Sequence, residues 1–160
     1  MNVKHVSLRL PWSPSANEIW GSLSGSYRPY LAPKYRKFLK EVSALYQAQG
    51  SPKFDEKNPL QVTIRLFPPH NRSYDIDNRV KPTLDALTKC GLWVDDRYVR
   101  RLTVCANVPV ENGAVIVEIE PFDEIKERGN VETILSWYGL KSLKSTKETK
   151  KTTKKERSKK

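Results

Sequence analysis

Four aspartates in the middle of the chain form two close pairs. Asp75 and Asp77 are two residues apart, and Asp95 and Asp96 follow some twenty positions later. In an extended segment, residues two apart point to the same side, so Asp75 and Asp77 would present both carboxylates on one face. An intervening helix of about 12 residues would extend roughly 18 Å. Residues 91–96 could return at most about 20 Å, so the pattern predicts that the acids converge.

Converging carboxylates predict a particular chemistry. Two of them about 4 Å apart repel by roughly 4 kcal/mol at an effective dielectric constant of about 20, and a divalent cation would remove this repulsion. No His or Cys stands at a useful spacing, so hard oxygen ligands favour Mg²⁺, or Mn²⁺, over zinc. Such a cation lowers the pKa of a bound water and stabilises charge on a phosphate. The acids therefore predict phosphodiester hydrolysis.

The same residues also have a purely structural interpretation. Asp77 or Asn78 could cap the first turn of a helix, and Asp95 and Asp96 could form an ordinary turn. Lys81 could pair with Asp77 four residues earlier, or it could reach a phosphate as a positive charge. Spacing alone does not separate these alternatives.

Hydrophobic periodicity predicts the elements that would position the acids. Alternating apolar residues predict four strands, over residues 6–10, 60–66, 102–108 and 115–119. Apolar spacings of three and four predict helices over 33–50, 78–90 and, as a short third one, 131–140. Pro82 would then have to fall in the first turn of the second helix. Residues 11–33 predict a long mobile loop, and Asn112-Gly113 predicts a hairpin between the last two strands.

This order of elements predicts a small α+β domain with a mixed sheet of about four strands packed against two main helices. We expect the domain over residues 1–121 and a C-terminal extension over residues 122–140. Residues 141–160 hold ten Lys or Arg and two Glu, and so carry eight of the eleven net positive charges of this 160-residue chain. We expect this Lys-rich tail to be disordered. It could bind polyanions by counterion release, or simply aid solubility.

The composition excludes an integral membrane protein. The longest aliphatic run covers residues 114–117, four residues, whereas a spanning helix requires about 20. The first ten residues lack the charged start and long apolar middle of a secretory signal, so we expect a cytoplasmic protein. The only two cysteines, Cys90 and Cys105, fit neither a disulfide scaffold nor a zinc site, which predicts free thiols.

Basic and aromatic side chains predict contacts with nucleic acid. The cations expected to contact it are Arg72, Arg79, Lys34, Arg36 and Lys37. Aromatic and basic residues that interleave could stack on unpaired bases, or could merely order a loop or cap a core; they are Trp20, Tyr27, Arg28, Tyr30 and Tyr35. His70, five residues before Asp75, could activate water, although a lone loop His is usually just solvent-exposed. His5 lies on a predicted strand.

The segment from Asp75 to Val99 resembles the signature of the RusA family of Holliday-junction resolvases. That signature contains two Asp and an Asn, a Lys three residues later, a Leu-Asp-Ala-Leu run, a Gly turn and an Asp pair before a Val. Its elements stand here as Asp75, Asp77, Asn78, Lys81, Leu84-Asp85-Ala86-Leu87, Gly91, Asp95-Asp96 and Val99. The opening Leu10-Pro11-Trp12, with Pro14-Ser15 and Asn17, is also similar to the start of that family. The resemblance covers roughly residues 3–121.

The resemblance implies a homodimeric, Mg²⁺-dependent endonuclease that makes paired cuts across four-way DNA junctions in recombination and repair. The metal carboxylates would be Asp75, Asp77 and Asp96, and the essential cation would be Lys81. Asp95 would be a supporting acid or a structural turn. The alternatives are an inactive junction-binding protein and a metal-dependent nuclease that acts on flaps or single strands.

One departure from the family pattern concerns DNA contacts. The best-known bacterial member has a run of Arg before the first Asp, whereas residues 70–74 here contain a single arginine, Arg72. Contacts with the junction would then be redistributed to the tail and to Lys34, Arg36 and Lys37. Residues 122–160 have no counterpart in the family pattern. The resemblance also implies that the source is a phage or a bacterium.

Overall fold

A computed structural model describes residues 5–22, 29–54 and 58–141. The chain divides into two units, residues 1–122 and residues 123–160, and each is described by itself. Apart from Lys141, the tail that the sequence predicts to be disordered lies outside the described residues.

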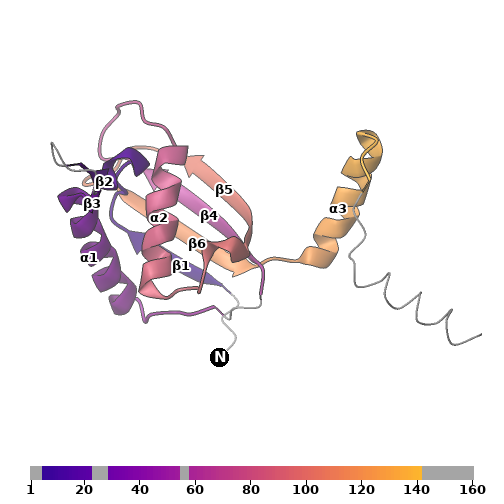
Figure 1. Cartoon of the computed structure of the whole chain (residues 1–160), viewed down its shortest axis with the longest axis horizontal. Helices are drawn as coiled ribbons and strands as arrows, with labels where there is room; N and C mark the ends of the chain where they lie inside the picture. The colour runs from indigo at the N-terminus through magenta and orange to yellow at the C-terminus, as the bar shows by residue number, and fades with distance from the viewer. Residues whose placement is uncertain (1–4, 23–28, 55–57, 142–160) are drawn as a thin grey trace, which may run out of the picture. The chain divides into compact units, whose positions relative to one another are not determined.

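The first unit contains a four-stranded mixed sheet with the strand order β1-β6-β4-β5 (Figure 1). Its strands are β1 (Val6–Leu10), β4 (Leu60–Phe67), β5 (Val99–Ala106) and β6 (Ala114–Pro121). β6 pairs antiparallel with both β1 and β4, whereas β4 and β5 are parallel. The predicted α+β class and four-stranded mixed sheet are confirmed.

Alternation along the strands gives the sheet one apolar and one polar face. Leu60, Val62, Ile64 and Leu66 are buried on β4, and the residues between them point to the other face. There Arg65 Nε lies 3.0 Å from Glu118 Oε2, and Gln61 Nε2 donates to Glu120 Oε2 at 2.7 Å. The apolar face therefore has to be covered, and the two helices of this unit cover it.

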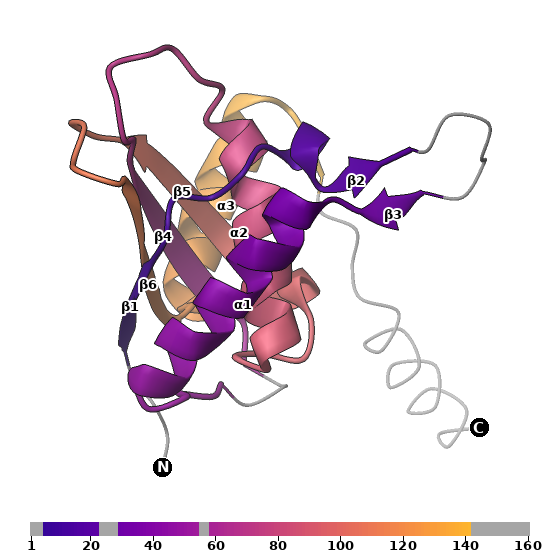
Figure 2. The ribbon, with the colours of Figure 1, turned by 90° about the vertical axis from the view of Figure 1, so that its left-hand side faces the viewer.

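Both helices, α1 (Pro33–Ala48) and α2 (Asp77–Cys90), lie over the same face of the sheet (Figure 2). α1 begins with Pro33, whose fixed φ suits the first turn. Its buried stripe includes Phe38 and Val42, and side chains of this size contribute roughly 1.5–3 kcal/mol each when they leave water. α2 ends at Gly91, which adopts the left-handed φ of 80° that favours glycine at a helix end. α2 joins β4 to β5 as a parallel crossover.

The predicted hairpin between the last two strands is wrong. Asn112 and Gly113 do form a turn, with φ of 63° and 66°, but β4 lies between β5 and β6 in the sheet. The turn fixes only the reversal of the chain. The order of the strands follows the burial of their side chains. β4 and β6 carry buried side chains along their length, whereas β5 is mostly exposed and occupies the edge of the sheet.

Several predicted boundaries also need correction. Residues 11–33 contain η1 (Ala16–Glu18) and the short strands β2 (Trp20–Gly21) and β3 (Tyr30–Leu31), which pair with each other. Local hydrogen bonds explain η1, because Ser15 and Glu18 form a capping box. β5 ends at Ala106, so Val108 lies beyond it. Pro82 is the sixth residue of α2 and therefore lies in its second turn.

The second unit contains one described helix, α3 (Glu124–Trp137), which begins seven residues before the predicted 131–140. The carboxylate of Asp123 accepts a hydrogen bond of 3.0 Å from the backbone N–H of Ile125, and this contact supports the earlier start. Gly139, with a φ of 63°, follows the helix. Among the helices of the described residues, none is long and apolar enough to cross a membrane.

The turn at Gly113 generates a stability prediction. A Cβ atom there would meet Trp12 Cβ and Pro69 Cδ at 2.9 Å, whereas a Cβ at Gly50, also at positive φ (87°), would meet nothing within 4 Å. We expect Gly50→Ala to cost roughly 1–2 kcal/mol of unfolding free energy through backbone strain alone. Gly113→Ala should cost roughly 1–3 kcal/mol more, because it also overpacks the turn. Denaturant titrations would measure both, and equal costs would contradict the close contact.

Candidate active site

The first turn of α2 presents two of the predicted acids in different ways. Asp77 is the first helical residue, and Ile76 stands at the N-cap without a side-chain capping bond. Asp75 precedes the helix, and its Oδ2 accepts a hydrogen bond of 3.2 Å from Asn78 Nδ2. Neither Asp77 nor Asn78 caps α2, so the capping interpretation of these residues is wrong.

The second pair of acids is split between two roles. Asp95 is the N-cap of η2 (Asp96–Tyr98), and its carboxylate accepts a hydrogen bond of 2.8 Å from the backbone N–H of Arg97. The Nε of Arg97 lies 4.0 Å from the same carboxylate. Of the two interpretations of Asp95, these contacts favour the structural turn. Asp96 is the first residue of η2, and its side chain has no such contact with the residues that the structure describes.

A cavity of about 460 Å³ brings Asp77, Lys81 and Asp96 together. We call it the aspartate cavity. Its remaining lining is aliphatic and comes from α2 with its N-cap residue and from β5: Ile76, Val80, Leu84, Leu102 and Val104. Within the described parts of the chain, the carboxylates of Asp77 and Asp96 have no hydrogen bond or ion pair. Both residues are exposed, so their oxygens are accessible to a cation from solvent.

The donor set fits a hard divalent cation, but the structure does not show a three-carboxylate cage. Among the described residues, no group of three or more His, Cys, Asp or Glu side chains is arranged to hold a metal. Asp75 does not line the aspartate cavity. Carboxylate oxygens are the ligands that Mg²⁺ and Mn²⁺ prefer. The metal role of Asp75, Asp77 and Asp96 thus stays a prediction.

Lys81 forms an ion pair in the opposite direction from the one that its spacing to Asp77 suggested. Its Nζ lies 3.0 Å from Asp85 Oδ2, one turn further along α2. The Lys81 side chain is 66% exposed. Exposed pairs of this kind contribute about 0–1 kcal/mol, so the ammonium group can exchange Asp85 for another anion at little cost.

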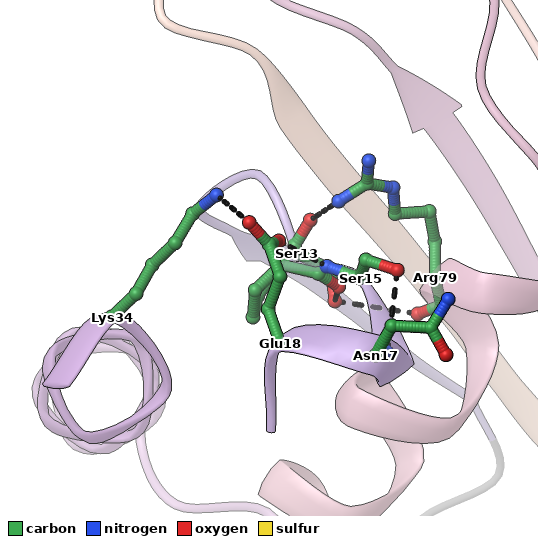
Figure 3. A network of polar contacts seen from close by, with 7 residues as sticks. Ser13, Ser15, Asn17, Glu18, Lys34 and Arg79 are labelled. Carbon is green, nitrogen blue, oxygen red and sulfur yellow. Dashed lines mark hydrogen bonds and ion pairs between the residues drawn. The ribbon is translucent and has the colours of Figure 1, made fainter. Parts of the chain in front are cut away.

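Several predicted DNA-contacting cations line a second, polar cavity of about 440 Å³. We call it the cationic cavity. Its lining is Trp12, Ser15, Glu18, Lys34, Pro69, His70, Arg72, Ser73, Tyr74 and Arg79. The Nζ of Lys34, on α1, lies 2.6 Å from Glu18 Oε1 (Figure 3), and the backbone N–H of Ser15 donates to Glu18 Oε2 at 2.8 Å. Burial opposes the charge of Glu18, but the hydrogen bonds from Lys34 and Ser15 prevail and lower the pKa of its carboxyl.

Arg79 connects α2 to the segment that follows β1. Its Nη1 donates to the carbonyl of Ser13 at 2.7 Å, and its own carbonyl accepts from Ser13 Oγ at 3.3 Å (Figure 3). The guanidinium lies over the ring of Trp12, 5.1 Å from its centroid. Burial lowers the pKa of Arg79, although the negative charges of Glu18 and Asp75 act in the other direction.

The remaining predicted cations lie elsewhere. Arg36 and Lys37 line a separate cavity of about 390 Å³ with Pro33 and Lys40, all on α1. Lys37 also lies 3.7 Å from Glu41. The structure therefore divides the predicted DNA contacts between this surface of α1 and the cationic cavity.

The predicted stacking aromatics also separate. Tyr35 is 1% exposed and belongs to the core, so of the two interpretations the structural one holds for this residue. Burial, with the nearby Asp85 charge, raises its pKa to about 12. Trp20 and Tyr30 are exposed on β2 and β3. Tyr27 and Arg28 lie outside the described residues.

Two histidines and two cysteines were also considered as candidate functional residues in the sequence. His70 lines the cationic cavity, which does not contain the predicted metal carboxylates. His5 lies 3.6 Å from Glu120 on the polar face of the sheet. Cys90 and Cys105 are free thiols, and burial raises the pKa of Cys90.

The aliphatic wall of the aspartate cavity and the aromatic wall of the cationic cavity could not be predicted from the sequence. Val80 and Leu102 come from two elements that only the parallel crossover places together. Trp12 and Arg79 are far apart in sequence, and no local pattern links them. The conspicuous Leu10-Pro11-Trp12 start was the one available signal.

Comparisons with known proteins agree with this description. A family model described as Endodeoxyribonuclease RusA matches residues 11–120. A crossover junction endodeoxyribonuclease rusA of Enterobacteria phage 82 is 30% identical over 113 residues, which cover 71% of this chain and 89% of the relative. The protein of that name from Enterobacteria phage HK97 is 28% identical over 72% of this chain and 94% of its own. The one from Escherichia coli strain K12 is 30% identical over 67% and 86%, respectively. The chain therefore belongs to the RusA endodeoxyribonuclease family.

Proposed function

We propose that this protein is a Mg²⁺-dependent endonuclease that resolves four-way DNA junctions by paired, symmetric incisions. Family membership supports the class of reaction, because the relatives named above are crossover junction endodeoxyribonucleases. The observation that carries the proposal for this chain is the aspartate cavity, whose lining Asp77, Lys81 and Asp96 share.

The residues of the aspartate cavity divide the work. Asp77 and Asp96 would hold Mg²⁺, with Asp75 as the third carboxylate once its neighbouring loop adjusts. The bound cation would lower the pKa of an attacking water and stabilise charge on the phosphate. Lys81 would leave Asp85 and place its ammonium group on a phosphate oxygen, where the negative charge increases during the reaction.

The junction itself argues for a homodimer. A four-way junction has near two-fold symmetry, and a two-fold dimer would place two active sites on opposed strands. One subunit could cut only once in each encounter. The relatives come from phages and from Escherichia coli, so we propose that the protein acts on DNA in the cytoplasm of a bacterial or phage-infected cell, in recombination and repair.

Two alternatives predict different behaviour. An inactive junction-binding protein would have lost one of the functional side chains, yet Asp75, Asp77, Lys81 and Asp96 are all present. A nuclease for flaps or single strands would keep the same metal chemistry and differ only in the DNA that it cuts.

The choice of substrate provides the first test. With Mg²⁺, we expect the protein to cut four-way junctions in preference to forked and linear DNA, and EDTA should abolish cutting without abolishing binding. A plasmid with an extruded cruciform should become linear without accumulating a nicked circle, because the two incisions are paired. Equal cutting of forked DNA would favour the flap alternative, and binding without cutting would favour the inactive one.

Two adjacent acids offer a matched test of the site. Asp77→Asn and Asp96→Asn should each abolish junction cutting, because each removes a charged oxygen from the aspartate cavity. Asp95→Asn should keep cutting near the wild-type rate, since Asn caps a helical turn about as well as Asp. Gel-based cutting assays with Mg²⁺ would measure the rates. Binding of the junction in EDTA would verify that the variants are folded. Full activity of Asp96→Asn would remove that residue from the site.

Lys81 can be separated from its ion pair with Asp85. Lys81→Gln should lower the cutting rate by about 100-fold or more, because a charge that stabilises the transition state is lost. Asp85→Asn breaks the same ion pair but keeps the ammonium group, so it should retain most of the activity. Thermal unfolding should change little in both variants, since the pair is exposed. If the two substitutions reduced cutting equally, Lys81 would act only through the pair.

A further inference from the structure

The apolar side chains of α3 are exposed to solvent. Six large ones lie on the helix or just after it: Ile125, Val131, Ile134, Trp137, Tyr138 and Leu140. The rings of Trp137 and Tyr138 are 76% and 74% exposed, more than any other aromatic side chain of the described residues. The second unit has no other described helix or strand that could cover them. A helix of 14 residues is marginally stable in water without packing, so we expect a ligand on this surface to stabilise α3.

The backbone fixes the positions from which the two rings project. Trp137 is the last residue of α3, and the N–H of Tyr138 continues the helical pattern by donating to the carbonyl of Ile134 at 3.2 Å. The chain then turns at Gly139, whose φ is 63°. Within the described part of the chain, neither ring stacks on another ring or on a cation. Both rings are therefore available to a planar ligand.

The charge of the second unit changes sign at these rings. Residues 123–132 contain four acids and two cations, whereas residues 133–147 contain three lysines and no acid. The first of these lysines, Lys141, comes three residues after Tyr138. A ligand that matches this end of the unit has flat apolar faces and negative charges. Single-stranded nucleic acid offers both, because its unpaired bases can stack on aromatic side chains while its phosphates contact cations.

The pattern along α3 disfavours two other occupants, a second copy of the helix and a membrane surface. Val131, Ile134 and Tyr138 follow one another at spacings of three and four, and Glu124 and Glu127 continue the same row towards the start of the helix. A paired helix needs apolar residues in such a row over three or four heptads. A helix that lies on a membrane needs an apolar face along its length. The two glutamates interrupt the row in both cases.

We propose that the end of α3 is a separate binding site for single-stranded DNA, in which Trp137 and Tyr138 stack on unpaired bases and Lys141 contacts a phosphate. Membership of an endodeoxyribonuclease family identifies the strand as DNA, but the family match ends at residue 120. The site therefore lies outside the matched domain. It adds affinity for DNA with unpaired bases and takes no part in the chemistry, so it does not depend on the proposed nuclease function.

Binding of a labelled oligothymidylate to the full chain in EDTA, followed by fluorescence anisotropy, tests the site directly. Trp137→Ala should weaken this binding by about fivefold or more, because base stacking is lost. It should leave binding of a duplex of equal length unchanged, since the bases of a duplex are already stacked on one another. Trp137→Phe keeps an aromatic ring and should retain most of the affinity. Ile125→Ala, at the acidic end of α3 and 86% exposed, is the matched control and should bind like the wild type.

The salt dependence of binding tests the contact of Lys141. Lys141→Gln should reduce the slope of log affinity against log salt concentration by about 0.7 for the single strand, because one phosphate contact is lost. An unchanged slope would overturn the assignment of a phosphate to Lys141. Circular dichroism and thermal unfolding of each variant would verify that the first unit is folded as in the wild type.

Three results would overturn the proposal. Unchanged binding of the oligothymidylate by Trp137→Ala would show that the ring does not stack on bases, and an equal loss for the single strand and the duplex would show a general effect on DNA binding. Binding of the wild type to vesicles of phosphatidylcholine and phosphatidylserine, or self-association in sedimentation, would identify another occupant if it required Trp137 while binding of the oligothymidylate did not. Failure of the wild type to cut any DNA would reject the nuclease function and leave these binding measurements valid.

Discussion

The length of α2 constrains the whole candidate site. Its 14 residues extend about 20 Å, and the chain from Gly91 to Asp96 can return at most about the same distance. Asp96 therefore meets α2 along its side, where Val80 and Leu84 line the aspartate cavity. Asp75 precedes the helix and does not line that cavity, so two of the predicted metal ligands share a lining from which the third is missing.

The contacts of Arg79 explain how the segment after β1 becomes part of the site. β1 lies at the far edge of the sheet from β5, yet the segment after β1 reaches the first turn of α2 through the reciprocal bonds of Ser13 and Arg79. Trp12 then forms a wall of the cationic cavity. Gly113 approaches the same Trp12 from the turn before β6. Three distant parts of the sequence thus meet at Trp12.

Much of the fold could be predicted from the sequence because its signals are local. The alternation of Leu60, Val62, Ile64 and Leu66 predicts β4, and the Pro33 start with its apolar stripe predicts α1. The partners of the strands could not be predicted in this way. Asn112-Gly113 specifies a turn, but the burial of β4 and β6, which depends on both helices, decides that β4 separates β5 from β6.

The site shows the same division between local and long-range information. The spacing of Asp75 and Asp77, and the family signature around them, identified the acids and Lys81. The separate role of Asp95 needed the geometry of η2, because adjacent aspartates look alike in a sequence. Tyr35 looked like a stacking residue beside basic neighbours, but its place on the buried stripe of α1 sends it to the core.

The placement of β6 has a consequence for synthesis on the ribosome. β6 is the last strand among the described residues, yet it pairs with β1 on one side and β4 on the other. A nascent chain cannot complete its sheet until β6 has emerged, and contacts between such distant segments are slow to form. Until then the apolar sides of β1 and β4 lack their shared neighbour, which favours association with chaperones or other chains. A DNA-cutting protein built in this order remains unassembled until almost all of its folded domain has been translated.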